Sequence, residues 1–186
     1  MAQQQQTLNL KTSPSESKAE SLNDLNNQVL YVREPSGQYR AADPAEALAS
    51  IEKSLLEEMK CRPVLNAPCL VKQWASAKLV AADIENFVVV FLDNRLRLIA
   101  EKTLATGTLS QCTVYPREVA RAVLQHEAAA VILVHNHPSG TADSSAADRQ
   151  LTKHISEALE LLDVRLIDHL IIARGQVVSM AEAGEL

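Results

Sequence analysis

The stretch Val131–Asp148, VILVHNHPSGTADSSAAD, brings two histidines and a carboxylate together within one short segment. An apolar run leads into His135 and His137, and side chains two residues apart on a strand point the same way. A turn containing proline and glycine follows, so the chain can return Asp148 towards the histidines. Two imidazoles and a carboxylate form a ligand set of catalytic zinc sites, which leave a fourth position open for water. The stretch therefore predicts a hydrolytic metal site.

A purely structural explanation competes with this one. His135 and His137 would then be ordinary hydrogen-bonded histidines at the end of a strand, and Ser145-x-x-Asp148 would be the capping box of a helix. The second part is compatible with a metal site, because a serine hydroxyl at a helix N-terminus can still donate to an oxyanion. A carboxylate in the first helical turn can likewise ligate a metal. Capping alone leaves the two histidines without a partner, which favours the metal.

The composition indicates a globular protein. Of the 186 residues, 47% are hydrophobic and 22% are charged, and the net charge is −5 at pH 7. This acidic balance disfavours a sequence-independent nucleic-acid binder, whose affinity comes from clustered Lys and Arg. The three cysteines have no CxxC spacing, which disfavours a disulfide framework or a Cys-rich zinc site. Because neither a signal peptide nor a membrane-spanning segment is recognisable, we expect a cytoplasmic protein with no membrane partner.

The composition changes along the chain and predicts three regions. Residues 1–28 are rich in Gln and Ser and are expected to be a disordered tail. Residues 29–62 are expected to form a short strand and a helix as an appendage, and residues 63–186 a single domain.

The hydrophobic pattern predicts the elements of that domain. After a helix that begins near Pro68, the strands, helices and final hairpin are expected at 86–92, 96–102, 116 onwards, 128–134, 145–162, 164–173 and 176–180. From the first of these strands the order is ββαβαββ. This order predicts an α/β fold with a mixed sheet and helices packed against it.

Metal-assisted hydrolysis also needs a general base. Glu85 is the candidate because it directly precedes the apolar strand 86–92, although that position is also ordinary for a polar residue at a strand boundary. His126-Glu127 lacks the second histidine of an HExxH helix. Asp168-His169 lies inside an apolar strand, where it is expected to serve packing and orientation more than catalysis.

These residues carry a resemblance to a known family. His135-x-His137-x7-Ser145-x2-Asp148, with a glutamate before an upstream strand, resembles the JAMM (MPN+) zinc metallopeptidase signature. The chain from about Pro63 to Leu186 is similar to the bacterial RadC family in these strings: Phe91-Leu92-Asp93-Asn94, Gly107-Thr108-Leu109, Pro116-Arg117-Glu118, His135-Asn136-His137-Pro138-Ser139-Gly140 and Asp168-His169.

The resemblance implies an MPN (JAMM) fold related to the cytidine deaminase-like arrangement. It implies that His135, His137 and Asp148 bind Zn²⁺, that Ser145 assists the oxyanion and that Glu85 is the general base. The chain departs from the family in two ways. Ser144 stands where RadC-like proteins usually have proline, and the tail and appendage replace the helix-hairpin-helix region of the longer members.

The sequence therefore leaves two hypotheses about function. The first is a zinc-dependent hydrolase, most concretely a metallopeptidase or isopeptidase that acts on a peptide or protein substrate. The alternative is a non-catalytic RadC-like module associated with DNA repair or a mobile element, for which the acidic charge gives little support. A nucleobase deaminase is excluded, because His137 stands where H-x-E needs glutamate and the later P-C-x-x-C is missing.

Overall fold

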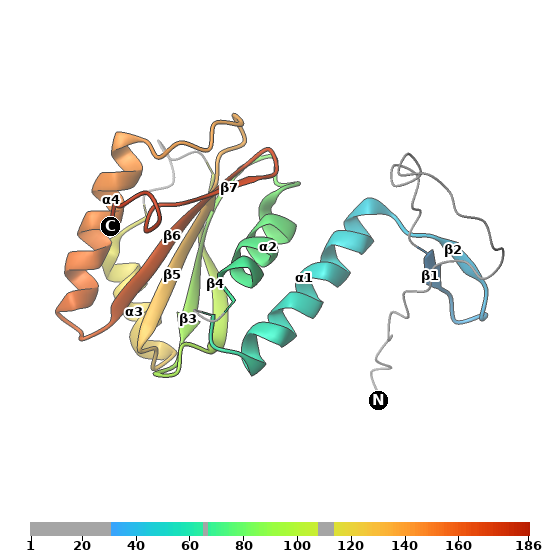
Figure 1. Ribbon diagram of the computed structural model, residues 1–186, viewed down its shortest axis with the longest axis horizontal. Coiled ribbons are helices and arrows are strands. Elements are labelled where there is room, and N and C mark those ends of the chain that lie inside the picture. Colours follow the sequence, from blue (N-terminus) through green and yellow to red (C-terminus); the bar gives the residue numbers. More distant parts are fainter. Residues whose placement is uncertain (1–30, 65–66, 108–113) are drawn as a thin grey trace. The chain divides into compact units, whose positions relative to one another are not determined.

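The computed structural model describes residues 31–64, 67–107 and 114–186 (Figure 1). The tail predicted for residues 1–28 lies outside these described residues. Contacts divide the chain into two units, Met1–Ser50 and Ile51–Leu186, and each unit is described by itself. No helix in the described ranges is long and apolar enough to cross a membrane.

The first unit contains a hairpin and the beginning of a helix. Strand β1 (Tyr31–Arg33) pairs antiparallel with β2 (Tyr39–Ala41), and α1 (Pro44–Cys61) starts after Asp43. The strand β2 was not predicted, because its three exposed residues show no apolar alternation. The turn between β1 and β2 therefore closes a hairpin.

The second unit is built on a five-stranded mixed sheet. Its elements after α1 are α2 (Pro68–Leu79), β3 (Glu85–Leu92), β4 (Leu98–Gly107), α3 (Pro116–Gln125), β5 (Ala130–Asn136), α4 (Ala146–Glu160), β6 (Arg165–Ala173) and β7 (Gln176–Ser179). The strand order is β4-β3-β5-β6-β7; β5 and β6 are parallel, and the other neighbouring pairs are antiparallel. The predicted mixed α/β sheet and the order ββαβαββ are confirmed.

Two strands differ from the prediction by two or more residues at each end. Strand β4 occupies 98–107 instead of 96–102, because Leu96 adopts a left-handed backbone conformation with φ 58° in the turn from β3. Strand β5 begins at Ala130 instead of 128, since Glu127, with φ 50°, ends the turn after α3.

Helices cover both faces of the sheet, with α2 on one face and α3 and α4 on the other (Figure 1). Alternate residues of the buried strands separate into two apolar clusters. Val88 and Ile132 pack on the α2 side, whereas Val89 and Leu133 pack on the side of α3 and α4. At the end of β5 the same alternation sends His135 to the α4 side and Asn136 to the opposite side.

An irregularity between β5 and β6 decides which side chain of β6 accompanies His135. The parallel register shifts by one residue between Val131 and Ile132, so Leu133 lies beside His169. Because a shift of one residue exchanges the faces of a strand, His169 lies on the α4 side. Asp168 lies on the α2 side, where it lines a cavity with residues of α2.

Candidate metal centre

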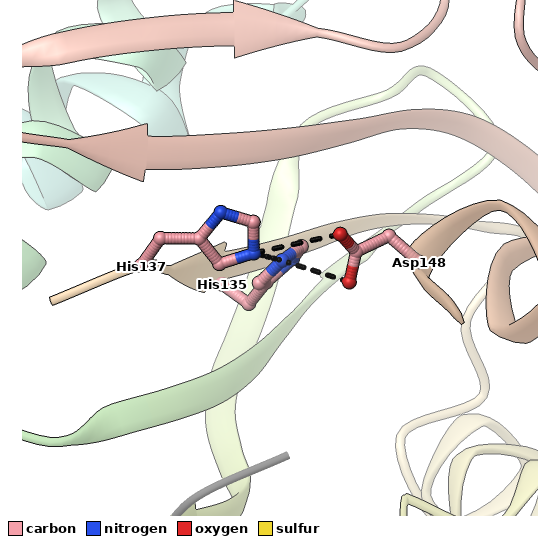
Figure 2. A group of neighbouring side chains, drawn as sticks. All are labelled: His135, His137 and Asp148. Carbon is pink, nitrogen blue, oxygen red and sulfur yellow. Dashed lines mark hydrogen bonds and ion pairs between the residues drawn. The ribbon is translucent and has the colours of Figure 1, made fainter. Parts of the chain in front are cut away.

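Three of the predicted site residues meet at the end of β5. His135 and His137 approach the carboxylate of Asp148 from the β5 end and the following turn, and Asp148 comes from the first turn of α4 (Figure 2). The Nε2 atoms of the two histidines are 2.9 Å apart. His135 Nε2 lies 3.3 Å from Asp148 Oδ1, and His137 Nε2 lies 3.5 Å from Asp148 Oδ2. The three side chains form a group that could hold a metal ion.

The donor set of this group suits zinc. In a tetrahedral site with bonds of about 2.0–2.1 Å, neighbouring ligand atoms are about 3.3 Å apart. The three separations of 2.9, 3.3 and 3.5 Å scatter around that value. The Nδ1 atom of His137 lies 2.8 Å from the Thr141 carbonyl oxygen, which can only accept, so Nδ1 carries the hydrogen. A neutral His137 then directs an unprotonated Nε2 into the group.

The turn after β5 is fixed by backbone bonds. The His137 N–H donates to the carbonyl of Ile172 at the end of β6, and the Gly140 N–H donates to the carbonyl of His137. Gly140 has φ +90°, a conformation that side-chain-bearing residues rarely adopt. A β-carbon at Gly140 would also overlap the side chain of Arg174. Glycine is therefore needed where the chain turns from the histidines towards α4.

The start of α4 places Asp148. Ser145 is the N-cap residue: its Oγ accepts from the Asp148 N–H at 3.1 Å, and Asp148 Oδ2 accepts from the Ser145 N–H at 2.8 Å. This is the predicted capping box, and it is confirmed. Burial opposes charge on Asp148, but the hydrogen bonds with Ser145 favour the ionised form, and the pKa of Asp148 lies below its ordinary value. The carboxylate is therefore ionised and available to a cation.

A second buried layer supports His135. His135 Nδ1 lies 2.8 Å from His169 Nε2, and His169 Nδ1 lies 2.6 Å from the hydroxyl oxygen of Thr152. The ring of Phe87 stacks on His135 and meets the edge of His169. Burial, together with the neighbouring His135, holds the pKa of His169 well below its ordinary value, so His169 is neutral.

The dipeptide Asp168-His169 does not act as a pair of side chains. Asp168 accepts from the backbone of His169 and Ala181 and from the hydroxyl of Ser179, which holds the chain after β7. His126, the other histidine weighed in the sequence, lies at the end of α3 with its ring against Phe91.

Glu85 begins β3 on the same side of the sheet as His135. It lies two residues from Phe87, which pairs with His135 across β3 and β5. Glu85 and His135 line one small cavity of about 10 Å³, which is close to the volume that a single water needs. Glu85 is half-buried and shares this small cavity with His135.

Asn136, between the two histidines, fixes the backbone on both sides of Glu85. Its Oδ1 accepts from the Asn86 N–H at 2.8 Å, and its Nδ2 donates to the Ile84 carbonyl at 3.0 Å. Its side chain is buried, so these bonds are shielded from water. The end of β5 therefore presents His135 on one side of the sheet and, on the other side, Asn136, which holds the backbone around Glu85.

Sequence reasoning missed Thr152 and Asn136. Thr152 follows Asp148 by four residues and so shares its face of α4, which is a signal that the helical period could have supplied. For Asn136 the signal was weaker, because a polar residue at a strand end is ordinary.

The comparisons with known proteins agree with this arrangement. The model of the family described as "RadC-like JAB domain" matches residues 65–185. The chain is 45% identical over 150 residues to a UPF0758 protein of Herminiimonas arsenicoxydans, covering 81% of this chain and 67% of the relative. It is also 45% identical over 150 residues to one of Methylibium petroleiphilum, with 81% and 68% covered. A UPF0758 protein of Variovorax paradoxus is 46% identical over 148 residues, with 78% and 66% covered. The chain, with its mixed sheet and its His-His-Asp group, belongs to the RadC-like JAB domain family.

Proposed function

We propose that this protein is a zinc-dependent hydrolase of the JAMM type that cleaves a peptide or isopeptide bond. The observation that carries the proposal is the convergence of His135 Nε2, His137 Nε2 and the Asp148 carboxylate on one point. The membership in the JAB domain family supports it. Bound zinc supplies a Lewis acid that polarises a carbonyl and lowers the pKa of water.

Glu85 acts as the general base in this proposal. Glu85 and His135 line one cavity that has about the volume of one water. Glu85 accepts a proton from the attacking water and transfers it to the leaving amine. The Asn136 bonds to the backbone at residues 84 and 86 keep the carboxylate in position for both transfers.

Ser145 stabilises the oxyanion. Its Oγ already accepts from the Asp148 N–H, which leaves the hydroxyl hydrogen for donation. The residue is exposed at the start of α4, where a substrate carbonyl can reach it. Loss of an oxyanion donor lowers kcat by about 10²–10³-fold in hydrolases.

A second cavity gives the substrate a place beside His137. Its volume is about 260 Å³, and it is lined by the end of α2 and the residues after it (79–83), by Pro138 and by Arg174. Pockets for small molecules occupy about 300–1,000 Å³. A slightly smaller cavity with apolar and charged walls suits a short segment of an extended polypeptide.

The test uses the full chain reconstituted with zinc and dialysed, with zinc content measured by mass spectrometry. We expect one zinc per chain, and we expect its loss in His137→Ala. His154→Ala is the matched control, because His154 is exposed on α4 and does not belong to the group. A folded wild-type protein without zinc would overturn the proposal.

Activity is measured on two synthetic decapeptide libraries, one linear and one with a lysine ε-amide branch, and products are identified by mass spectrometry. Glu85→Gln is expected to keep zinc and lose cleavage, whereas the exposed control Glu157→Gln keeps both. A zinc-loaded wild-type protein that cleaves neither library would contradict the hydrolase and favour the non-catalytic alternative.

A further inference from the structure

We infer that His169 and Thr152 are positioning residues that fix the hydrogen of His135 on Nδ1 and so leave its Nε2 free to bind metal. This inference rests on the proposed zinc site and extends it to two residues outside the ligand set. The carrying observation is a chain of short contacts from the α4 backbone through Thr152 and His169 to His135. The two residues in the middle of these contacts are buried: Thr152 is 2% exposed and His169 is 0% exposed.

These contacts allow only one consistent arrangement of hydrogens, which follows from the partners of Thr152. The hydroxyl oxygen lies 2.6 Å from the carbonyl oxygen of Asp148 and 2.6 Å from Nδ1 of His169. A carbonyl oxygen can only accept, and a hydroxyl has one hydrogen. Thr152 therefore donates to Asp148, because the opposite choice would press two lone pairs together at that distance.

The position of the hydrogen on His169 follows. Since the Thr152 hydrogen is already used, His169 Nδ1 must donate to the Thr152 oxygen. The ring of His169 is 0% exposed, where an unpaired charge is costly, so with its one hydrogen on Nδ1 its Nε2 carries a lone pair and can only accept.

The same reasoning reaches His135. Its Nδ1 lies 2.8 Å from the accepting His169 Nε2, so His135 Nδ1 carries a hydrogen. A neutral His135 then has no hydrogen on Nε2, the atom 3.3 Å from Asp148 Oδ1. His137 also carries its hydrogen on Nδ1, through Thr141, so the two Nε2 atoms 2.9 Å apart present lone pairs that only a cation can bring together. Hydrogen bonds of this kind to a ligating histidine typically change metal affinity by about 10–100-fold.

Both ends of this series of contacts lie in the metal-binding group. The series starts at the backbone carbonyl of Asp148 and ends at the ring of His135. Helix α4 and strand β6 thus hold the carboxylate and the imidazole in one hydrogen-bonded unit. The orientation of His135 therefore depends on α4 as well as on its own strand.

The first experiment measures zinc affinity by competition with a chromophoric chelator at pH 8. Thr152→Val keeps the shape of threonine and removes its oxygen, whereas Thr152→Ser keeps the hydroxyl. We expect about 10-fold weaker zinc binding in Thr152→Val and less than a threefold change in Thr152→Ser. Equal affinities in the two variants would overturn the inference.

His169 is tested in the same assay with two substitutions. His169→Phe removes the acceptor for His135 Nδ1–H and is expected to weaken binding by about 10–100-fold. His169→Gln offers an amide oxygen to that hydrogen and is expected to recover at least half of the loss on a logarithmic scale. A folded His169→Phe variant, checked by near-ultraviolet circular dichroism, with wild-type affinity would contradict the role of His169.

The second experiment needs neither activity nor zinc. Long-range ¹H–¹⁵N correlation spectra of the metal-free protein report which ring nitrogen of each histidine carries hydrogen. We expect His135 to be protonated at Nδ1 in the wild type and to populate the Nε2–H form in Thr152→Val. An Nε2–H form in the wild type would overturn the inference. Failure of the zinc proposal appears separately, as a wild-type protein that takes up no metal.

Discussion

The two faces of the sheet differ in what they bury. Towards α2, the strands present an apolar cluster that includes Trp74 and Met59, both fully buried. Towards α4, the apolar cluster is interrupted at the end of β5 by a connected group of buried polar residues: His135, Asp148, Thr152 and His169. Apolar burial is non-directional, whereas buried polar groups need partners at defined distances. The first face therefore stabilises the fold, and the second fixes the site.

The largest effect on stability is expected at Trp74, on the face that carries none of the metal-binding residues. Trp74→Ala removes a fully buried ring from the α2 face and is expected to lower the free energy of unfolding by about 3–5 kcal/mol. The variant should still bind one zinc per folded chain, because Trp74 touches no residue of the metal-binding group. Urea denaturation and zinc content measure the two quantities.

Trp74→Phe is the matched control. The indole N–H of Trp74 is buried without a hydrogen-bond partner in the part of the chain that the structure describes. Phenylalanine removes this group and keeps most of the apolar area, so it should lose less than half as much stability as alanine. A loss of zinc in Trp74→Ala that exceeds the unfolded fraction would mean that the two faces are coupled.

A smaller effect is expected at Asn136, whose side chain contributes both to the stability of the fold and to the position of Glu85. Asn136→Ala leaves the Asn86 N–H and the Ile84 carbonyl without their partner, which costs about 1–3 kcal/mol of stability. Zinc should be retained while peptide cleavage falls, since the support of Glu85 is lost. Asn94→Ala, in the exposed turn after β3, controls for the loss of an asparagine. Unchanged cleavage in Asn136→Ala would show that Glu85 is held by other contacts or is not the base.

The smallest of these effects is expected at Gly140. Gly140→Ala forces a side-chain-bearing residue into φ +90° and should cost about 1–2 kcal/mol. The overlap with Arg174 involves a flexible side chain, so adding Arg174→Ala should recover less than about 0.5 kcal/mol. Thermal unfolding of the two single variants and the double variant measures the coupling. Full recovery in the double variant would show that crowding, not backbone conformation, sets the requirement for glycine.

The sequence was sufficient where a signal is local. The alternation of His135 and His137, the spacing of Ser145 and Asp148, and the apolar runs of β3 and β5 all depend on a few neighbouring residues. These features led to the mixed sheet and to the three residues that converge. The short strand β2 lacked such a signal, because its residues YRA are exposed and unpatterned.

The partners of the site residues could not be predicted, because they depend on the register between strands. Without the shift of one residue in the pairing of β5 with β6, Asp168 and not His169 would lie beside Leu133 and towards α4. The irregularity between Val131 and Ile132 reverses this assignment, and the string LIDHLIIA carries no mark of it. The contact of Asn136 with the backbone around Glu85 likewise requires β3 and β5 to be paired first.

The parallel pairing of β5 with β6 has a consequence for the order of folding. His135 and His169 become neighbours only after α4 has crossed between the two strands and the loop has closed. Such a crossover forms slowly compared with a hairpin, because chain entropy is lost before the strand contacts are gained. During synthesis, His135 and His137 leave the ribosome before β6, which carries His169. Tight metal uptake would accordingly mark the moment at which β6 docks, and binding would favour the completed fold by mass action.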